Sequence, residues 1–188
     1  MTKRKITAKE IFSIPNLMGY FRILLIPVFT WIYVQADSVS DYYTAAVLVG
    51  ISGLTDMFDG KVARKFNMIT ELGKFIDPLA DKLLVCSALI CLVEMGKIPA
   101  WIVIIIVSRE FIISGFRLVA SDKGVVIAAG YWGKFKTTFQ MVMIVLMIAD
   151  IPVLSLVTTI VMWAALILTV VSLVDYLVNN KDCLKDQK

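Results

Sequence analysis

The chain has 188 residues, of which 59% are hydrophobic and 18% are charged, and its formal net charge is +4. This composition, with a mean hydropathy of +0.83, excludes an ordinary soluble domain and places the chain among integral membrane proteins. The small positive excess indicates contact with anionic lipid headgroups of a bilayer rather than with nucleic acid.

Apolar runs joined by short links predict an all-α membrane protein with six transmembrane helices. The runs cover approximately residues 17–34, 42–66, 73–95, 98–121, 132–149 and 152–178. The basic residues 1–16 precede a run of spanning length that lacks a small-residue cleavage site. We therefore expect a short amino-terminal interfacial segment, and a single membrane domain over residues 1–188.

Charge asymmetry predicts the topology of these helices. The links that would lie outside, residues 35–41, 94–97 and 150–151, contain one of the 19 Lys and Arg residues, Lys97. Because cytoplasmic links carry the excess of cations, both termini are expected in the cytoplasm. The second run has few uncharged residues before Asp56, so the acidic stretch that follows should emerge at the cytoplasmic surface of the cell membrane.

Four aspartates, Asp56, Asp59, Asp77 and Asp81, lie in the second and third runs, where an ionisable group is costly and is by default a functional-site hypothesis. On helices, Asp56 and Asp59 share one face, and Asp77 and Asp81 share another with Gly73. Two such faces turned toward each other would form an all-oxygen site of the kind that Mg²⁺ or Mn²⁺ prefers. The alternative is that the acids are merely solvated in a capped loop.

Small residues and one arginine accompany these acids. Gly60, Ala63 and Gly73 leave room for phosphates to approach the backbone, and Arg64 offers a planar cation to a phosphate or a nucleotide. The chain has no histidine, so proton transfer would fall to a carboxylate, a lysine or a tyrosine.

The whole acidic pattern, D-x2-D-G-x2-A-R-x8-G-x3-D-x3-D, resembles the signature of the CDP-alcohol phosphotransferase family at every fixed position. The resemblance implies two divalent cations, Mg²⁺ or Mn²⁺, with Asp81 also as the general base, and a homodimer. The implied ligands of the two cations are Asp56, Asp59, Asp77 and Asp81. The implied binding residues for the donor, CDP-diacylglycerol, are Asp59, Gly60, Ala63, Arg64 and Gly73.

Two further features near the acids each allow two interpretations. The family commonly shows N-x2-T-x2-R in the first run, where this chain has Asn16, Gly19 and Arg22, so the threonine is replaced. Arg22 could also simply extend its head toward the interface. Pro78 either bends its helix, which would help to aim the acids, or lies in the first turns, where it disturbs little.

A second polar cluster follows in the fourth run and after it. Arg109, Arg117, Lys134 and Lys136 could bind the phosphate of a small anionic acceptor. The alternative is an internal ion pair between Arg109 and Glu110 beside ordinary loop lysines. The patterns R-E-x4-G-x-R and G-K-x-K-T resemble the phosphatidylglycerophosphate synthase branch of the family, which implies glycerol 3-phosphate as the acceptor.

The reaction implied by the resemblance transfers a phosphatidyl group from CDP-diacylglycerol to glycerol 3-phosphate, giving phosphatidylglycerol phosphate and CMP. The nearest alternative is the same chemistry with serine, inositol phosphate or phosphatidylglycerol as the acceptor. A divalent-cation transporter would also carry intramembrane acids, but would not need the glycines, alanine and arginine at fixed offsets. A non-catalytic lipid-binding protein would leave the acids unexplained.

Overall fold

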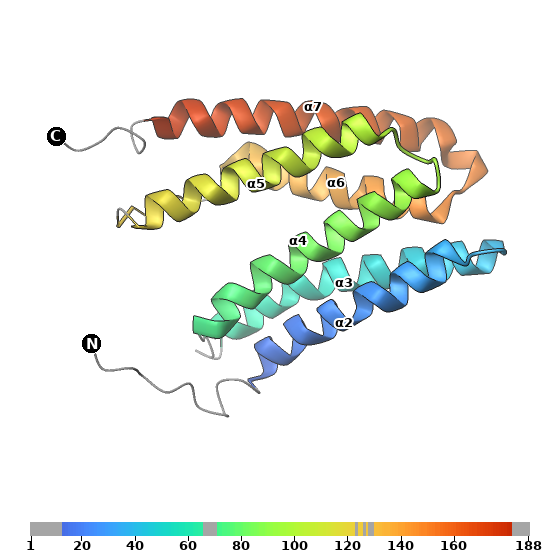
Figure 1. Cartoon of the computed structure of the whole chain (residues 1–188), viewed down its shortest axis with the longest axis horizontal. Helices are drawn as coiled ribbons and strands as arrows, with labels where there is room; N and C mark the ends of the chain where they lie inside the picture. The colour runs from blue at the N-terminus through green and yellow to red at the C-terminus, as the bar shows by residue number, and fades with distance from the viewer. Residues whose placement is uncertain (1–12, 66–70, 123, 126, 128–129, 182–188) are drawn as a thin grey trace. The chain divides into compact units, whose positions relative to one another are not determined.

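The structure is a computed structural model that describes residues 13–65, 71–122, 124–125, 127 and 130–181 (Figure 1). These residues form α-helices and a 3-10 turn, and no strand occurs among them. In chain order the elements are α2 (Ile14–Val34), α3 (Val39–Lys65), α4 (Glu71–Glu94), α5 (Ala100–Asp122), α6 (Tyr131–Ala149), η1 (Pro152–Leu154) and α7 (Ser155–Asn180). The all-α prediction is confirmed, and each apolar run coincides with one helix.

The links at residues 35–38, 95–99 and 150–151 are short and are closed by local hydrogen bonds. At the start of α3, the hydroxyl of Ser38 donates to Asp41 Oδ2 at 2.7 Å, and the amide of Asp41 donates back to that hydroxyl at 3.3 Å. This reciprocal arrangement caps the helix, and the bonds from Ser38 lower the pKa of the Asp41 carboxyl. Asp150 ends α6 in the left-handed conformation, with φ 46°, and pairs with Lys97.

The chain divides into two compact units, Met1–Cys91 and Leu92–Lys188. In the first unit α2 packs along α3. Small side chains allow this close approach, since Ala45 and Ala46 of α3 are buried. Tyr33 of α2 stacks on Phe29 and meets Tyr42 edge to face, with ring centroids 5.8 and 5.9 Å apart. These contacts fix the first unit at the ends of α2 and α3 that the short link joins.

In the second unit α7 packs against both α5 and α6. One part of its core consists of Ile113 and Phe116 from α5 with Tyr176 from α7, and the two aromatic rings meet edge to face at 5.5 Å. Met143, Ile144 and Ile148 of α6 are also buried. Helices α5, α6 and α7 are thus held together by apolar contacts around the polar cluster described below.

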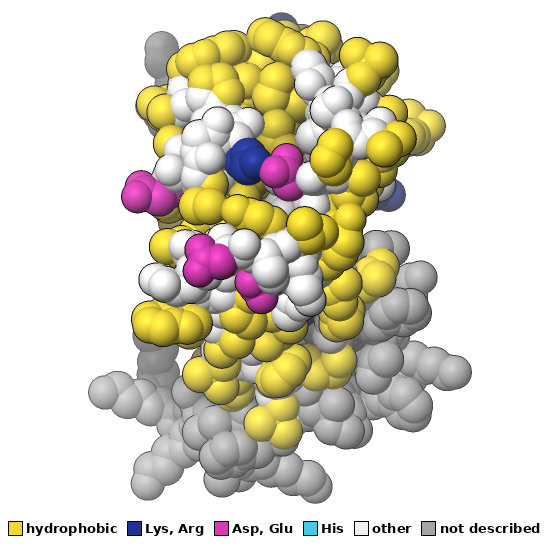
Figure 2. Space-filling view, turned by 90° about the vertical axis from the view of Figure 1, so that its right-hand side faces the viewer, with side chains coloured by type: hydrophobic (Ala, Val, Ile, Leu, Met, Phe, Trp, Pro, Cys, Tyr) yellow, Lys and Arg dark blue, Asp and Glu magenta, His cyan; other side chains and the backbone are white. Residues whose placement is uncertain are grey.

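Long apolar stripes remain exposed on the outer faces of the helices. On α2 the exposed side chains recur every three or four residues, at Leu17, Phe21, Leu24, Val28 and Trp31. Such a stripe is too large for a soluble monomer and is consistent with a membrane protein. Residues 16–34 and 152–180 are long and apolar enough to cross a bilayer, by length and composition. Hydrophobic side chains also dominate the described surface in Figure 2.

Candidate active site

Two of the four acids lie on α4, at the spacing that the sequence predicted. Asp77 and Asp81 are one helical turn apart and half-buried, and Gly73 is buried one turn earlier. Because residues four apart share a helix face, the two carboxylates project from the same side of α4. Their oxygen donors fit a hard divalent cation.

The other part of the motif lies near the end of α3. The helix continues to Lys65, so the backbone of Asp56, Asp59, Gly60, Ala63 and Arg64 is helical, as the spacing argument required. The side chains of these five residues lie outside what the structure describes. No group of three or more acidic or cysteine side chains gathers among the described ones, and the four-acid metal site stays a prediction.

Helix α2 closely approaches α4 at the acids. A Cβ added to Gly19 would lie 2.7 Å from Ile76 Cγ2 and 3.4 Å from Asp77 Oδ1. The glycine that replaces the common threonine of the family is therefore the residue that lets α2 approach α4 at this point. Any larger residue would have to displace a buried isoleucine next to Asp77.

The polar residues on either side of Gly19 are also inside the protein. Asn16 is fully buried and Arg22 is 2% exposed. The interpretation that Arg22 extends its head into the interface is therefore wrong, because its guanidinium is covered by the protein. A buried arginine requires polar or anionic partners, and this first-run element is part of the core of the first unit.

Pro78 lies inside α4, beyond its first turn. The alternative in which it sits harmlessly at the helix start is therefore not supported. Since proline lacks an N–H, the carbonyl of Lys74 loses its usual helical donor, about one turn before Asp77, the first acid of the stripe.

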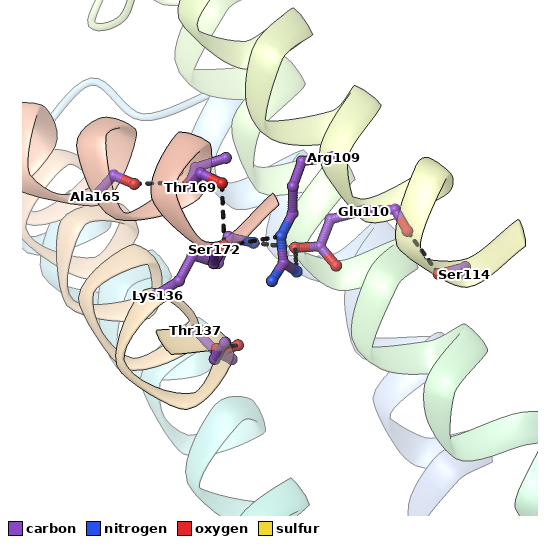
Figure 3. A network of polar contacts seen from close by, with 9 residues as sticks. Arg109, Glu110, Ser114, Lys136, Thr137, Ala165, Thr169 and Ser172 are labelled. Atoms are coloured by element: carbon purple, nitrogen blue, oxygen red, sulfur yellow. Dashed lines mark hydrogen bonds and ion pairs between the residues drawn. The ribbon is translucent and has the colours of Figure 1, made fainter. Parts of the chain in front are cut away.

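In the second unit, the four cations predicted to bind the phosphate of the acceptor substrate divide into a buried pair and an exposed pair. Arg109 of α5 is 7% exposed, and Lys136 of α6 is 1% exposed. Both donate to the same atom, Oε1 of Glu110, with Arg109 Nη1 at 3.3 Å (Figure 3). Ser172 of α7 accepts from Arg109 Nε at 3.2 Å, so three helices meet in this network.

Arg117 and Lys134 are exposed. The guanidinium carbon of Arg117 lies 5.7 Å from the ring centroid of Tyr176, a cation–π contact that orients the arginine along α7. The ion pair between Arg109 and Glu110, which the sequence left as the alternative, is present. It extends to Lys136, so that two cations share one carboxylate, and the acceptor role of all four cations remains a prediction.

Sequence reasoning missed several polar residues around this network. Ser172 and Gln140 stand alone in apolar helices, and nothing in their spacing marks them. Gln140 lies one turn after Lys136, and its buried Oε1 has no hydrogen-bond partner among the described residues. The hydroxyl of Tyr176 is likewise buried and has no hydrogen-bond partner among the described residues. The one available signal was Glu110 itself, a carboxylate inside an apolar run beside Arg109.

Comparison with known proteins identifies the family of this chain. The model of the CDP-alcohol phosphatidyltransferase family matches residues 12–171. The chain belongs to this family, which confirms the resemblance found in the acidic motif.

Individual relatives align over most of their length. The chain is 42% identical over 190 residues to the CDP-diacylglycerol–glycerol-3-phosphate 3-phosphatidyltransferase of Bacillus subtilis, covering 93% of this chain and 98% of that protein. It is 37% identical over 181 residues to the protein of the same name from Haemophilus influenzae, with 93% and 97% covered. A probable phosphatidylglycerophosphate synthase of Mycobacterium tuberculosis is 36% identical over 170 residues, with 89% and 81% covered.

Proposed function

We propose that this protein transfers the phosphatidyl group of CDP-diacylglycerol to glycerol 3-phosphate, giving phosphatidylglycerol phosphate and CMP. The observation that carries the proposal is the complete acidic motif in a chain that aligns almost end to end with relatives named for this activity. The oxygen of the acceptor hydroxyl bonds to the phosphorus on the lipid side of the donor. The bond from that phosphorus to the CMP oxygen breaks, and CMP leaves with the electron pair.

Within this proposal the acids have two tasks. Asp56, Asp59, Asp77 and Asp81 hold two divalent cations, Mg²⁺ or Mn²⁺. When bound, such cations neutralise the pyrophosphate and stabilise the charge on the leaving CMP. Asp81 also takes the proton of the acceptor hydroxyl. The half-buried positions of Asp77 and Asp81 on one face of α4 support this assignment.

Donor and acceptor are assigned to different groups of residues. The donor is held by Asp59, Gly60, Ala63, Arg64 and Gly73, and Gly73 is buried on the acidic face of α4. The acceptor phosphate is bound by Arg109, Arg117, Lys134 and Lys136. The concentration of positive charge on α5 and at the start of α6 supports the acceptor assignment, because a phosphate requires convergent cations.

All six helices cross the cell membrane in this proposal, with both termini and the acids on the cytoplasmic side. The exposed apolar stripe of α2 and the length of α7 support it. The working form is a homodimer, an expectation that comes from the family alone.

CMP release tests the reaction. Purified protein is supplied with CDP-diacylglycerol in detergent micelles, and CMP is measured with and without glycerol 3-phosphate and with a divalent-cation chelator. CMP should appear only when acceptor and cation are both present. A transporter or a lipid-binding scaffold would release none under any condition, and release that ignores the chelator would reject the role given to the acids.

A further inference from the structure

Glu110 connects Arg109 and Lys136, the two buried cations among the described residues of the second unit, through a single oxygen atom. Its Oε1 accepts from Arg109 Nη1 on its own helix and from Lys136 Nζ on α6 (Figure 3). Two cations that bind the same oxygen are held close together, although their like charges repel. The carboxylate is therefore what allows the arginine and the lysine to converge.

The burial of these groups makes the carboxylate necessary. The side chains of Arg109 and Lys136 are 8% and 1% exposed, whereas that of Glu110 is 20% exposed. A buried cation without a counter-charge is strongly unfavourable, so removing Glu110 would force the two cations apart or toward solvent. With Glu110 in place the trio still carries a net charge of +1, from two cations and one carboxylate, which favours an incoming anion.

Two nitrogens of the Arg109 guanidinium make hydrogen bonds to described residues, and the third does not. Its Nε donates to Ser172, and Nη1 donates to Glu110. Its Nη2 has no hydrogen-bond partner among the residues that the structure describes, and lies 3.6 Å from the point that a Cβ at Gly133 would occupy. Because residue 133 has no side chain, this edge of the guanidinium is not covered from the first turn of α6.

The hydroxyl of Ser172 is itself oriented by the backbone of α7. It donates to the carbonyl of Thr169 at 3.0 Å, so its oxygen is directed at Arg109 as an acceptor. The plane of the guanidinium is thus set from two sides, by α7 and by Glu110. Planar bidentate recognition of a phosphate depends on such an orientation.

We propose that Glu110, assisted by Ser172, is a positioning residue for acceptor binding. It holds Arg109 and Lys136 in the convergent, charged arrangement that the phosphate of glycerol 3-phosphate meets, and it acts through these cations without touching the substrate. This inference rests on the proposed function, and it assigns a role to a carboxylate that lies outside the acidic motif.

Steady-state kinetics with both substrates tests this role. Glu110→Gln keeps the shape of the side chain and removes its charge, so the KM for glycerol 3-phosphate should rise about tenfold to a hundredfold. The KM for CDP-diacylglycerol should stay near the wild-type value, whereas the melting temperature should fall, because two buried cations lose their counter-charge. Adding Glu110→Gln to Lys136→Gln should raise the acceptor KM by less than Glu110→Gln does in the wild-type protein, since Glu110 acts in part through that lysine.

Two further variants keep the test decisive. Asp150→Asn also removes a carboxylate paired with a lysine in the second unit, and should leave both KM values unchanged. Ser172→Ala removes only the hydroxyl that orients Arg109, and should raise the acceptor KM several-fold even if Glu110→Gln does not fold. An unchanged acceptor KM in Ser172→Ala, or equal losses for donor and acceptor in Glu110→Gln, would overturn the inference. A wild-type protein without acceptor-dependent CMP release would instead reject the proposed function.

Discussion

Replacing the Asp77 carboxylate by an amide tests the effect of its charge without changing its size. Asp77→Asn keeps the volume of the side chain and removes its charge, and an amide costs less to bury than a carboxylate. CMP release should therefore collapse, by at least about a hundredfold if the carboxylate holds a catalytic cation. Helix content, measured by circular dichroism, should remain at the wild-type level.

The matched control is Asp37→Asn, which removes an exposed carboxylate from the link between α2 and α3. It should retain full activity. Near-normal turnover in Asp77→Asn at saturating Mg²⁺ would show that the acidic face of α4 holds no catalytic metal.

Arg117 and Arg64 give opposite expectations because they are assigned to different substrates. Arg117→Ala should raise the KM for glycerol 3-phosphate about tenfold to a hundredfold, the loss expected for one charge-assisted hydrogen bond. The KM for CDP-diacylglycerol should barely change. Arg64→Ala should show the reverse pattern, and both KM values are to be measured in both variants.

The two arginine variants control each other. Equal losses for both substrates in both proteins would indicate general structural damage. An Arg117→Ala protein with wild-type acceptor kinetics would remove this exposed arginine from the acceptor site, although its contact with Tyr176 would remain.

The acids were predictable from the sequence because fixed helical offsets place carboxylates on one face whatever surrounds them. The shared oxygen of Glu110 was not predictable. It depends on how α5 packs against α7 and where α6 begins, and a serine such as Ser172 in an apolar helix has no sequence pattern that marks it. The burial of Arg22 was missed for the same reason, since spacing does not show which face another helix covers.

At the scale of whole helices, the contact of α2 with α4 depends on one missing side chain. Gly19→Ala would place a Cβ 2.7 Å from Ile76 Cγ2, which is closer than carbon atoms can pack. Ile76 is buried and branched at Cβ, so it has little freedom to move away. We expect a loss of about 1–3 kcal/mol in the free energy of unfolding, the usual cost of overpacking. We also expect that a higher Mg²⁺ concentration is needed for half-maximal activity.

Gly115→Ala provides the comparison for that variant. Gly115 lies inside α5, and an added Cβ there would meet no atom within 4 Å. Its melting temperature in detergent should not fall below the wild-type value. If Gly19→Ala also melts at the wild-type temperature and keeps its Mg²⁺ dependence, the close approach of α2 to Asp77 is not needed for the site.

The helices themselves were predictable almost to their ends, because apolar runs of this length between polar links leave little freedom in where a helix can begin. The differences lie in the terminal turns. Helix α3 begins at Val39 rather than near residue 42, because Ser38 and Asp41 cap it in a way that hydropathy does not detect. At the start of the last run, Pro152 begins a 3-10 turn before α7.

At the scale of the whole molecule, the six-span topology makes a prediction about accessibility. In a variant whose Cys86, Cys91 and Cys183 are replaced by serine, a new cysteine at Ser40 should react with a membrane-impermeant maleimide in intact cells. A new cysteine at Ser121 should react only after permeabilisation, because it would lie on the cytoplasmic side. Both positions are exposed in the structure, so burial does not limit the reaction.

Reaction of Ser121→Cys in intact cells, with no reaction of Ser40→Cys, would show that the orientation in the membrane is opposite to the one proposed. Reaction of both positions in intact cells would contradict the three spans that the topology places between them. Mass spectrometry of the labelled protein provides the readout.

The central claim is that this protein joins a phosphatidyl group to glycerol 3-phosphate, and an acceptor panel tests it most directly. Purified protein is given one donor, CDP-diacylglycerol with Mg²⁺, and in turn glycerol 3-phosphate, glycerol, serine, inositol phosphate and phosphatidylglycerol, and the lipid product is identified by mass. The account predicts phosphatidylglycerol phosphate with glycerol 3-phosphate, and at least about a hundredfold lower kcat/KM with glycerol, which lacks the phosphate that the cations would bind. A preference for any other acceptor, or equal rates with glycerol and glycerol 3-phosphate, would contradict it.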